Sequence, residues 1–465
     1  MPRQTSISFR ALRLVAAFIA MVLLGTGASA ADDASTAAVS FNRDIAPILR
    51  AKCVTCHNAE KSKGGYRLHT FGNLAKAGDS GDAPIVPGKP ASSKLHQVLV
   101  TTDADERMPQ KDDALPPAQI ALFARWIEQG AKFDGADPKA GLDTLVVRAP
   151  HREPPAVYPR PVPVLALAFT PDGQELVASG YHEVTFWNPT DGRLTRRVSQ
   201  LPQQIQAIAF SPISNVVAVC GGTPGVSGEV TLVDRRDPKR HHVLATGGDF
   251  FLCLAFSPDG RHLLAGGADN VIRVFDVATG RELKRLEIHA DWVLGLGFAP
   301  DGKHFASASR DKTARLFSTA SWELEETYDA HAQPVFAVAF ARGGKRVLSG
   351  ARDREIHAWT PADAKKVFEI GGSGADVTRL LCANDTLFSV SADGSVRQHR
   401  VVDKQAELIR AYPAAKDVVH ALAFDAGMKR LAVGSHDGSV RVFDAEKGAL
   451  LREFLAAPTA HRSAN

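Results

Sequence analysis

The longest regular pattern of the chain begins near residue 164, where short apolar runs alternate with polar turns at a nearly constant interval. Seven stretches repeat one arrangement of strand, turn and strand, as in VLALAFTPDGQELVASG and FLCLAFSPDGRHLLAGG. The same position of each unit is held by Phe169, Phe210, Phe256, Phe298, Phe340, Cys382 and Phe424. These residues are 41, 46, 42, 42, 42 and 42 positions apart, and the long interval contains GGTPGVSGE, which indicates a lengthened loop. A period near 42 with four short strands per unit predicts a seven-bladed β-propeller over residues 161–457, followed by a tail at 458–465.

Helical periodicity is found in the segment 41–133. In FNRDIAPILRAKC, the apolar residues Ile45, Ile48 and Leu49 have the spacing i, i+3, i+4, which predicts an amphipathic helix. PPAQIALFARWIEQGAKF predicts a second helix, which begins at a proline and ends at a glycine. The two helices enclose a loop-rich middle, so the core of this segment is thin and is expected to need a staple.

The two patterned regions are joined by a proline-rich stretch. Seven prolines occur between residues 138 and 163, which predicts an extended linker over residues 134–160. Within it, LDTLVVR at 142–148 has the composition of a strand. It therefore competes with ALLREF at 449–454 as the strand that closes the ring, and the sequence leaves the two alternatives open.

The first thirty residues are typical of an export signal. Basic residues precede the apolar run LVAAFIAMVLL, and GTGASA provides small residues for cleavage. The run has the length of a signal core and is too short to span a bilayer. We expect residues 1–30 to be removed near Ala30, so that the mature chain has no transmembrane segment and is periplasmic or otherwise exported. A retained, uncleaved anchor is the alternative.

Composition and charge narrow the classes of function that the protein can have. The chain is 45% hydrophobic and 23% charged, which is ordinary for a globular protein. Three basic residues lie in the predicted signal, and the remainder carries 52 basic against 51 acidic residues. This balance gives no electrostatic footprint for nucleic acid. Three cysteines stand alone in apolar, strand-like segments and are expected to be small buried hydrophobes: Cys220, Cys253 and Cys382.

The other two cysteines form the motif that carries chemistry. Cys53 and Cys56 are three positions apart and are followed directly by His57. Two thiols at this spacing can add to the two vinyl groups of one haem, and the histidine can then bind its iron. A zinc site would need a second Cys or His pair, but only the isolated His69 and His96 are at hand. A redox-active Cys-x-x-Cys would need a βαβ surround, which the pattern lacks.

A six-coordinate iron needs a second axial ligand opposite His57. The predicted mature chain has two methionines, Met108 and Met428, and the first lies in the polar stretch DERMPQKDD, where packing gives no reason for it. Met108 is therefore the favoured ligand, and a His and Met pair raises the reduction potential relative to two histidines. Ligation by His69 or His96 remains an alternative, as does an incidental exposed methionine.

With these residues, the segment resembles the class I cytochrome c fold and, more narrowly, the c-type cytochrome domain common in planctomycetes. The stretches that carry the resemblance are FNRDIAPILRAKCVTCHN, GGYRLHTF, VPGKPASSKLHQVL, RMPQ and LPPAQIALFARWIEQGA. His69 stands where an acidic residue is usual, and RMPQ replaces Met-Pro-Pro. The resemblance implies a small all-α cytochrome domain at 41–133 that carries one covalent haem c.

The same resemblance implies how this domain packs. The first and last helices cross in this fold, so Ile48 and Leu49 should meet Phe123 or Ile127. Trp126 is expected either to pack near the haem or to fill the core.

The repeats resemble the WD-repeat family. The fifth unit matches the hydrogen-bonded set of that family with His331, Ser349, Asp353 and Trp359. The fourth unit keeps His289, Ser307 and Asp311 and has Phe317 in place of the tryptophan. The resemblance implies that these residues are structural, because they satisfy polar groups buried between strands. It also implies a binding platform for a protein partner.

The sequence thus predicts a multidomain protein, with a small all-α cytochrome c domain followed by an all-β seven-bladed WD-type propeller. The favoured function is an exported c-type cytochrome that transfers single electrons to a redox partner and uses the propeller for docking. No catalytic residue is identified, which favours an electron-transfer or binding protein over an enzyme. Two alternatives stay open: a periplasmic oxidoreductase whose propeller holds a second cofactor or substrate, and a haem-stapled scaffold or redox sensor.

Overall fold

The computed structural model describes residues 39–54, 56–59, 61–110, 113–134, 138–139, 141–142 and 151–459. The predicted signal peptide, the cleavage site at Ala30 and nearly all of LDTLVVR lie outside these residues. The chain divides into two compact units, residues 1–145 and 146–465, which are described separately. In the described part of the chain, every helix is too short or too polar to cross a membrane.

The first unit is built from short helices joined by loops. Its elements are η1 (Phe41–Ile45), α1 (Ala46–Lys52), η2 (Lys63–Gly65), α2 (Phe71–Leu74), η3 (Pro90–Ser92), α3 (Lys94–Val100) and α4 (Pro117–Glu128). The first helix opens with a π-helical turn, η1, that runs directly into α1. A proline lies in the first turn of α1 and of α4, where the missing N–H has no helical partner to lose.

Aromatic side chains form the centre of the first unit. Phe41 packs edge-on against Phe71, with ring centroids 4.8 Å apart, and lies 5.4 Å from Trp126. The indole of Trp126 is 1% exposed and donates its N–H to the carbonyl of Lys132 at 3.0 Å. Trp126 therefore fills the core, which decides between the two roles that the sequence left open.

The residues expected to meet across the first and last helices lie in this same core. Leu49, Phe123 and Ile127 are buried in one cluster, and Ile48 packs against it. The turn η1 also contacts α4. The periodicity of both segments therefore identified the faces that are buried.

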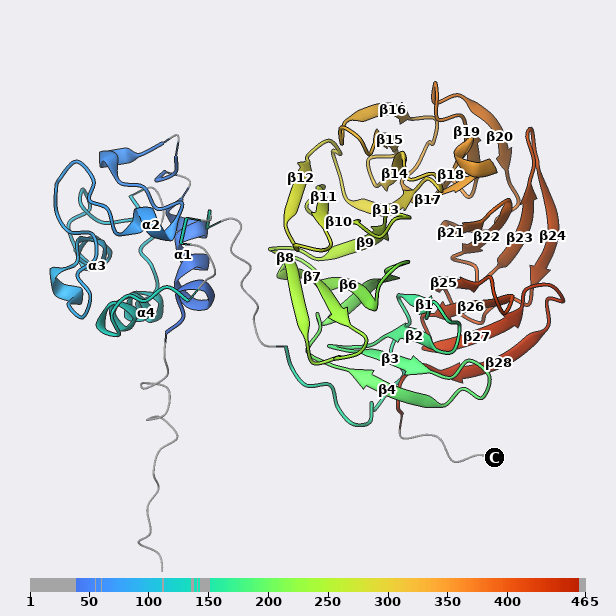
Figure 1. Cartoon of the computed structure of the whole chain (residues 1–465), viewed down its shortest axis with the longest axis horizontal. Helices are drawn as coiled ribbons and strands as arrows, with labels where there is room; N and C mark the ends of the chain where they lie inside the picture. Colours follow the sequence, from blue (N-terminus) through green and yellow to red (C-terminus); the bar gives the residue numbers. More distant parts are fainter. Residues whose placement is uncertain are drawn as a thin grey trace, which may run out of the picture. The chain divides into compact units, whose positions relative to one another are not determined.

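The second unit is a ring of seven four-stranded antiparallel sheets, as Figure 1 shows. The first blade contains β1 (Leu167–Phe169), β2 (Leu176–Ser179), β3 (Val184–Trp187) and β4 (Leu194–Val198). The second contains β5 (Gln204–Phe210), β6 (Val216–Thr223), β7 (Ser227–Asp234) and β8 (His241–Gly247). The third contains β9 (Phe251–Phe256), β10 (His262–Gly267), β11 (Ile272–Asp276) and β12 (Glu282–Leu286).

The remaining four blades repeat this arrangement. The fourth contains β13 (Val293–Phe298), β14 (His304–Ser309), β15 (Ala314–Ser318) and β16 (Leu324–Tyr328). The fifth contains β17 (Val335–Ala341), β18 (Arg346–Ala351), β19 (Ile356–Trp359) and β20 (Lys366–Ile370), with the short turn η4 (Arg342–Gly344). The sixth contains β21 (Val377–Ala383), β22 (Thr386–Ser391), β23 (Val396–Val401) and β24 (Ala406–Tyr412). The seventh contains β25 (Val419–Asp425), β26 (Arg430–Ser435), β27 (Ser439–Asp444) and β28 (Leu450–Leu455).

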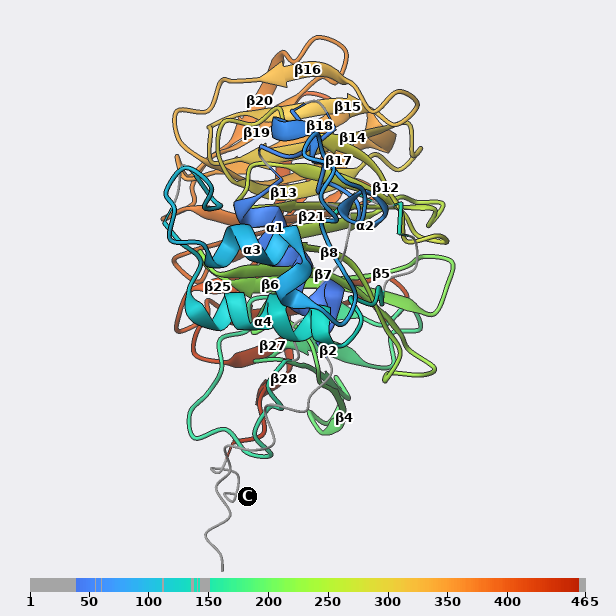
Figure 2. The ribbon, with the colours of Figure 1, turned by 90° about the vertical axis from the view of Figure 1, so that its left-hand side faces the viewer.

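The predicted seven blades are confirmed, with one blade for each sequence unit. The seven residues that recur in the sequence units, from Phe169 to Phe424, each lie in the first strand of a blade. These first strands line the centre of the ring (Figure 1). Figure 2 turns the ring on edge, with β16 at its upper end and β4 and β28 at its lower end. Neighbouring blades bury their apolar faces against each other, as β9 does against β13.

The Gly-rich insertion is not a lengthened loop. It extends the hairpin of the second blade, because residues 221–223 belong to β6 and residues 227–229 to β7. Glycine permits this extension, since a Cβ atom on Gly221 would lie 1.8 Å from the carbonyl oxygen of Gln204. A hairpin satisfies the backbone N–H and C=O groups that an open loop would leave to water.

Among the described residues, the last blade takes all four of its strands from one continuous stretch of the chain. ALLREF provides β28, the fourth strand of the last blade, and β28 pairs with β27. The chain before β1 adds a bridge at the seam, where Tyr158 pairs in parallel with Thr459. The hydroxyl of Tyr158 donates to Glu183 at 2.5 Å, and Arg197 donates to the same buried carboxylate at 2.6 Å. Residues 151–160, assigned to the linker by their prolines, thus pack on the propeller.

The fifth blade contains the expected polar set. His331 Nδ1 lies 2.7 Å from a carboxylate oxygen of Asp353, and His331 Nε2 lies 2.9 Å from the hydroxyl of Ser349. The indole N–H of Trp359 donates to the same hydroxyl at 3.3 Å. Burial lowers the pKa of His331, although the hydrogen bond to Asp353 opposes this shift. A neutral imidazole that donates to Asp353 and accepts from Ser349 satisfies every partner.

The fourth blade repeats this arrangement without the tryptophan. His289 lies 2.7 Å from Asp311 and 2.7 Å from the hydroxyl of Ser307. Burial raises the pKa of the Asp311 carboxyl, but the hydrogen bonds from His289 and Thr313 outweigh it and hold this pKa well below its usual range. Asp311 therefore stays ionised and fixes the loop to the strand.

Another buried histidine gives the propeller a pH-dependent stability. His399 in β23 is 5% exposed, and its Nδ1 atom has no hydrogen-bond partner. Burial, assisted by Arg397, lowers the pKa of His399 to about 4. The unfolded chain has a histidine pKa of about 6.5, so it binds more protons than the folded chain between about pH 6.5 and pH 4. Stability that is present above this window is lost as the pH falls through it.

We expect His399→Gln to reduce this acid sensitivity. Between about pH 7 and pH 4.5, the wild-type propeller should lose on the order of 2 kcal/mol more free energy of unfolding than the variant, after allowance for solvent screening. Urea denaturation followed by circular dichroism at the two pH values measures the difference. An equal loss in both proteins would show that His399 is not the titrating group.

Candidate haem site

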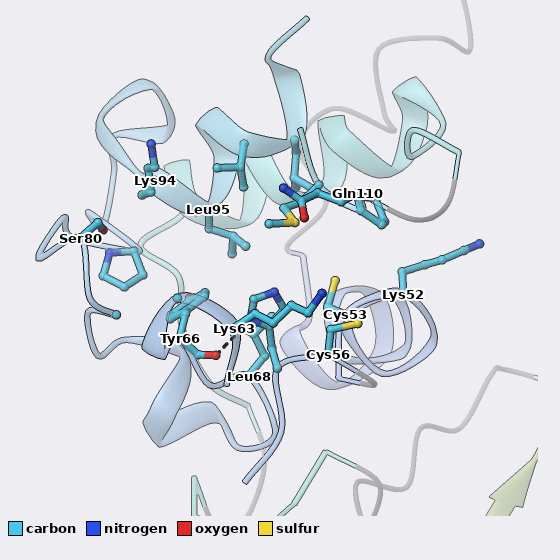
Figure 3. Close-up of a pocket in the computed structure, with 18 of the residues that line it drawn as sticks. Lys52, Cys53, Cys56, Lys63, Tyr66, Leu68, Ser80, Lys94, Leu95 and Gln110 are labelled. Atoms are coloured by element: carbon cyan, nitrogen blue, oxygen red, sulfur yellow. Dashed lines mark hydrogen bonds between the residues drawn. The ribbon is translucent and has the colours of Figure 1, made fainter. Parts of the chain in front are cut away.

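One cavity in the first unit gathers the whole Cys-x-x-Cys-His motif together with Met108. Its volume is about 470 Å³, within the range of cofactor sites. Much of the wall is apolar and includes Leu68, Leu95, Val98 and Leu99. Figure 3 shows Cys53, Cys56 and Tyr66 on one side of the cavity and Leu95 and Gln110 on the other. An apolar wall with few convergent polar groups is typical of a site for a largely apolar cofactor.

A tight turn brings the two thiols to one wall. The backbone N–H groups of Cys53 and Val54 both donate to the carbonyl of Leu49 at the end of α1, at 2.9 and 3.0 Å. The next bonds run back to the carbonyl of Cys53, from Cys56 at 3.2 Å and from His57 at 3.1 Å. Both cysteines are free. Burial, assisted by Cys56, raises the pKa of the Cys53 thiol to about 11, so this thiol is protonated at neutral pH.

A backbone carbonyl sets the tautomer of His57. Its Nδ1 atom lies 3.0 Å from the carbonyl oxygen of Tyr66. Because a carbonyl only accepts, Nδ1 carries the proton and donates, which leaves the lone pair on Nε2 for a metal. Tyr66 is held in turn, since its hydroxyl donates to the carbonyl of Leu74 at 2.7 Å. The motif histidine is thus oriented so that its Nε2 atom is available to a metal.

Met108 reaches the cavity from a different element. Its backbone N–H donates to the carbonyl of Val98 at 2.8 Å, which fixes the loop beside α3. Neither His69 nor His96 lines the cavity. The imidazole of His69 faces Asn73 instead, with Nε2 and the amide nitrogen 3.3 Å apart. Among the candidate axial ligands, the structure therefore brings only Met108 to the motif.

The donor set fits a covalent haem better than a bare metal ion. Two free thiols, an imidazole with a fixed tautomer and a thioether from another loop surround one apolar cavity. Among the described residues, only Glu355, His357 and Glu369 have three ligand atoms close enough to share one ion. The motif side chains do not converge in this way, which disfavours the zinc alternative.

Two groups of site residues carried no signal in the sequence. The carbonyl of Tyr66 acts through its backbone, and any residue type supplies a carbonyl. Three lysines also line the cavity, which makes part of its lining positive: Lys52, Lys63 and Lys94. The sequence does not show that these lysines meet, because their positions depend on how the loops fold. A positive lining suits a ligand with carboxylates.

Comparisons with known families agree with this division of the chain. Residues 53–112 match the family described as Planctomycete cytochrome C. Three stretches match the WD domain, G-beta repeat: residues 238–276, 280–318 and 322–360. Residues 381–461 match the Anaphase-promoting complex subunit 4 WD40 domain.

Individual proteins are also similar to parts of this chain. The Periodic tryptophan protein 2 homolog of Schizosaccharomyces pombe is 28% identical over 135 residues, which are 28% of this chain and 13% of that protein. Mitogen-activated protein kinase-binding protein 1 of Mus musculus is 34% identical over 86 residues, which are 18% and 5% of the two chains. The chain thus spans a small fraction of these relatives. The crystal structure of the computationally designed Ika8 protein aligns with a TM-score of 0.52 and 23% identity, over 65% of this chain and 90% of that one. That likeness shows the fold alone.

Proposed function

We propose that this chain, which carries a planctomycete cytochrome C domain followed by a seven-bladed WD40 propeller, is a c-type cytochrome that exchanges single electrons with a protein docked on the propeller. One observation carries the proposal: Cys53, Cys56, His57 and Met108, from two separate loops, line the same apolar cavity. A haem bound here would supply one-electron chemistry.

The residues of the cavity have distinct roles in this proposal. Cys53 and Cys56 would hold a haem through their thiols, and His57 would bind its iron through Nε2. The carbonyl of Tyr66 holds the proton on Nδ1 and keeps the ring oriented. Met108 would offer its thioether sulfur to the iron from the other loop. The apolar wall excludes water, which keeps the environment of the cofactor at low polarity.

The propeller supplies a surface for a partner rather than a reaction. WD-type propellers present the loops between strands at their rims, and the histidine, serine and aspartate residues of the fourth and fifth blades are occupied by structural hydrogen bonds. The propeller is therefore proposed to bring a redox partner protein to the cytochrome domain. Export after cleavage near Ala30 is part of the same proposal, since it accords with the signal-like N-terminus and with haem attachment outside the cytoplasm.

Expression of the full chain in a host with c-type haem maturation tests the proposal. One iron per chain, haem that stays attached after denaturation and a reversible one-electron change in the visible spectrum are expected. A chain that matures without covalent haem would contradict the central proposal. A second chromophore would instead favour the alternative oxidoreductase.

A substitution at Met108 tests the second axial ligand. We expect Met108→Ala to retain covalent haem, because the thioethers are untouched, but to lose sulfur ligation and lower the reduction potential. The reduction potential and the sulfur-to-iron charge-transfer band of the oxidised protein measure this change. Met428→Ala is the matched control, since Met428 is exposed on the propeller. Unchanged properties in Met108→Ala would return His69 or His96 to consideration.

A further inference from the structure

The centre of the propeller contains a second cavity, unrelated to the Cys-x-x-Cys-His motif. It is lined by residues of the innermost strand of every blade and has a volume of about 210 Å³. Most of the lining residues are apolar by type, yet the lining is more polar than apolar, because the backbone of the inner strands forms much of it. The cavity is smaller than the sites of drug-sized ligands, so it has room for a few non-hydrogen atoms.

An arginine in β21 lines this cavity. The guanidinium of Arg379 donates to the neighbouring carbonyl of Thr378 at 3.0 Å. Among the residues that the structure describes, no carboxylate lies within 4.0 Å of it. A guanidinium has five N–H donors and stays charged in proteins, so most of its hydrogen-bonding capacity has no protein partner.

The surroundings of Arg379 supply no counter-charge. Burial lowers the pKa of Arg379, with the Cys253 thiol opposing the shift. Burial also raises the pKa of Cys253 to about 12, so this thiol is uncharged at neutral pH. On the adjacent strand β25, burial lowers the pKa of His420, with His436 and Arg379 adding to this shift and Asp417 opposing it. The guanidinium of Arg379 therefore has no partner of opposite charge among the described residues, and an anion that enters the channel would gain from pairing with it.

We propose that the central channel binds a small monocarboxylate, whose carboxylate pairs with the guanidinium of Arg379. The planar fork of arginine matches the two oxygens of a carboxylate. One unpaired cation suits a single negative charge, which favours a carboxylate over a phosphate dianion. The small volume admits only a short acyl group, and the amide of Gln206 adds a polar contact, because it lines the cavity and has only a 3.5 Å hydrogen bond to Gln204.

Calorimetric titration of the full chain with sodium propionate, at constant ionic strength in chloride, tests this site. Propionamide is the neutral probe of equal size. We expect propionate to bind wild type at one site and propionamide to bind at least about tenfold more weakly, since hydrogen bonds to charged groups are the strong ones. Arg379→Gln should weaken propionate binding by about tenfold or more, and Arg379→Lys by less. Arg400→Gln, which alters an exposed arginine of the same blade, should have no effect.

Three outcomes would overturn the proposal. These are equal binding of propionate and propionamide, unchanged binding in Arg379→Gln, and no propionate binding where a glutamate-rich peptide does bind. The last would assign the carboxylate to a partner's side chain. The comparison of propionate with propionamide uses wild type alone, so it decides the question even where a variant fails to fold.

Discussion

Replacing both Cys53 and Cys56 with serine is expected to abolish covalent haem attachment. The two thiols are the only cysteines that line the cavity of the first unit, and serine does not form the thioether bonds. The mass of the denatured chain and its haem stain measure the result directly. Each single variant leaves one thiol, so it should attach haem in reduced yield through one bond.

The control for this experiment lies in the propeller. Cys382→Ser removes a half-buried thiol that contacts the carbonyl of Asn384 at 3.1 Å, far along the chain from the motif. This variant should retain the full amount of haem. Haem that remains attached in the double serine variant after denaturation would contradict the assignment of the motif. Loss of haem together with a native circular dichroism spectrum of the propeller would assign the defect to the first unit.

The sequence predicted the propeller well because each blade repeats one local rule. An alternating strand, a turn and a second apolar strand recur about every 42 residues. Each of these signals depends only on residues a few positions apart in the sequence. What it missed depends on distant partners. The packing of residues 151–160 rests on Tyr158 meeting Glu183 and Arg197. A count of prolines does not reveal those contacts. The extension of β6 and β7 likewise rests on the close approach of Gly221 to Gln204.

The candidate site divides in the same way. The motif cysteines and His57 are recognisable because the chemistry demands a fixed spacing. Met108 was favoured by elimination, and His69 and His96 stayed open since sequence gives no distances. The structure separates these candidates by placing only Met108 on the cavity. Arg379 had no sequence signal at all, because an arginine in a strand gives no sign that it faces a channel or lacks an acidic partner.

Truncation of the tryptophan in the fifth blade should cause the largest loss of stability in the propeller. Trp359 is fully buried, and its ring stacks on Tyr328 with centroids 5.1 Å apart and planes 2° apart. Trp359→Ala removes this contact and leaves a cavity that the rigid sheets on both sides do not fill. We expect the free energy of unfolding of the propeller to fall by about 3–5 kcal/mol, measured by urea denaturation.

The fourth blade supplies the matched control for this substitution. There Phe317 occupies the equivalent position and stacks on Phe305, with centroids 4.6 Å apart and planes 5° apart. Trp359→Phe should therefore cost about 1–2 kcal/mol, because an aromatic ring is kept and only the indole N–H and some volume are lost. The hydroxyl of Ser349 still bonds to His331 in this variant. If alanine and phenylalanine destabilised the propeller equally, the hydrogen bond to Ser349 rather than the stacked ring would be the main contribution of Trp359, and the blades would then be held by their polar sets more than by their apolar faces.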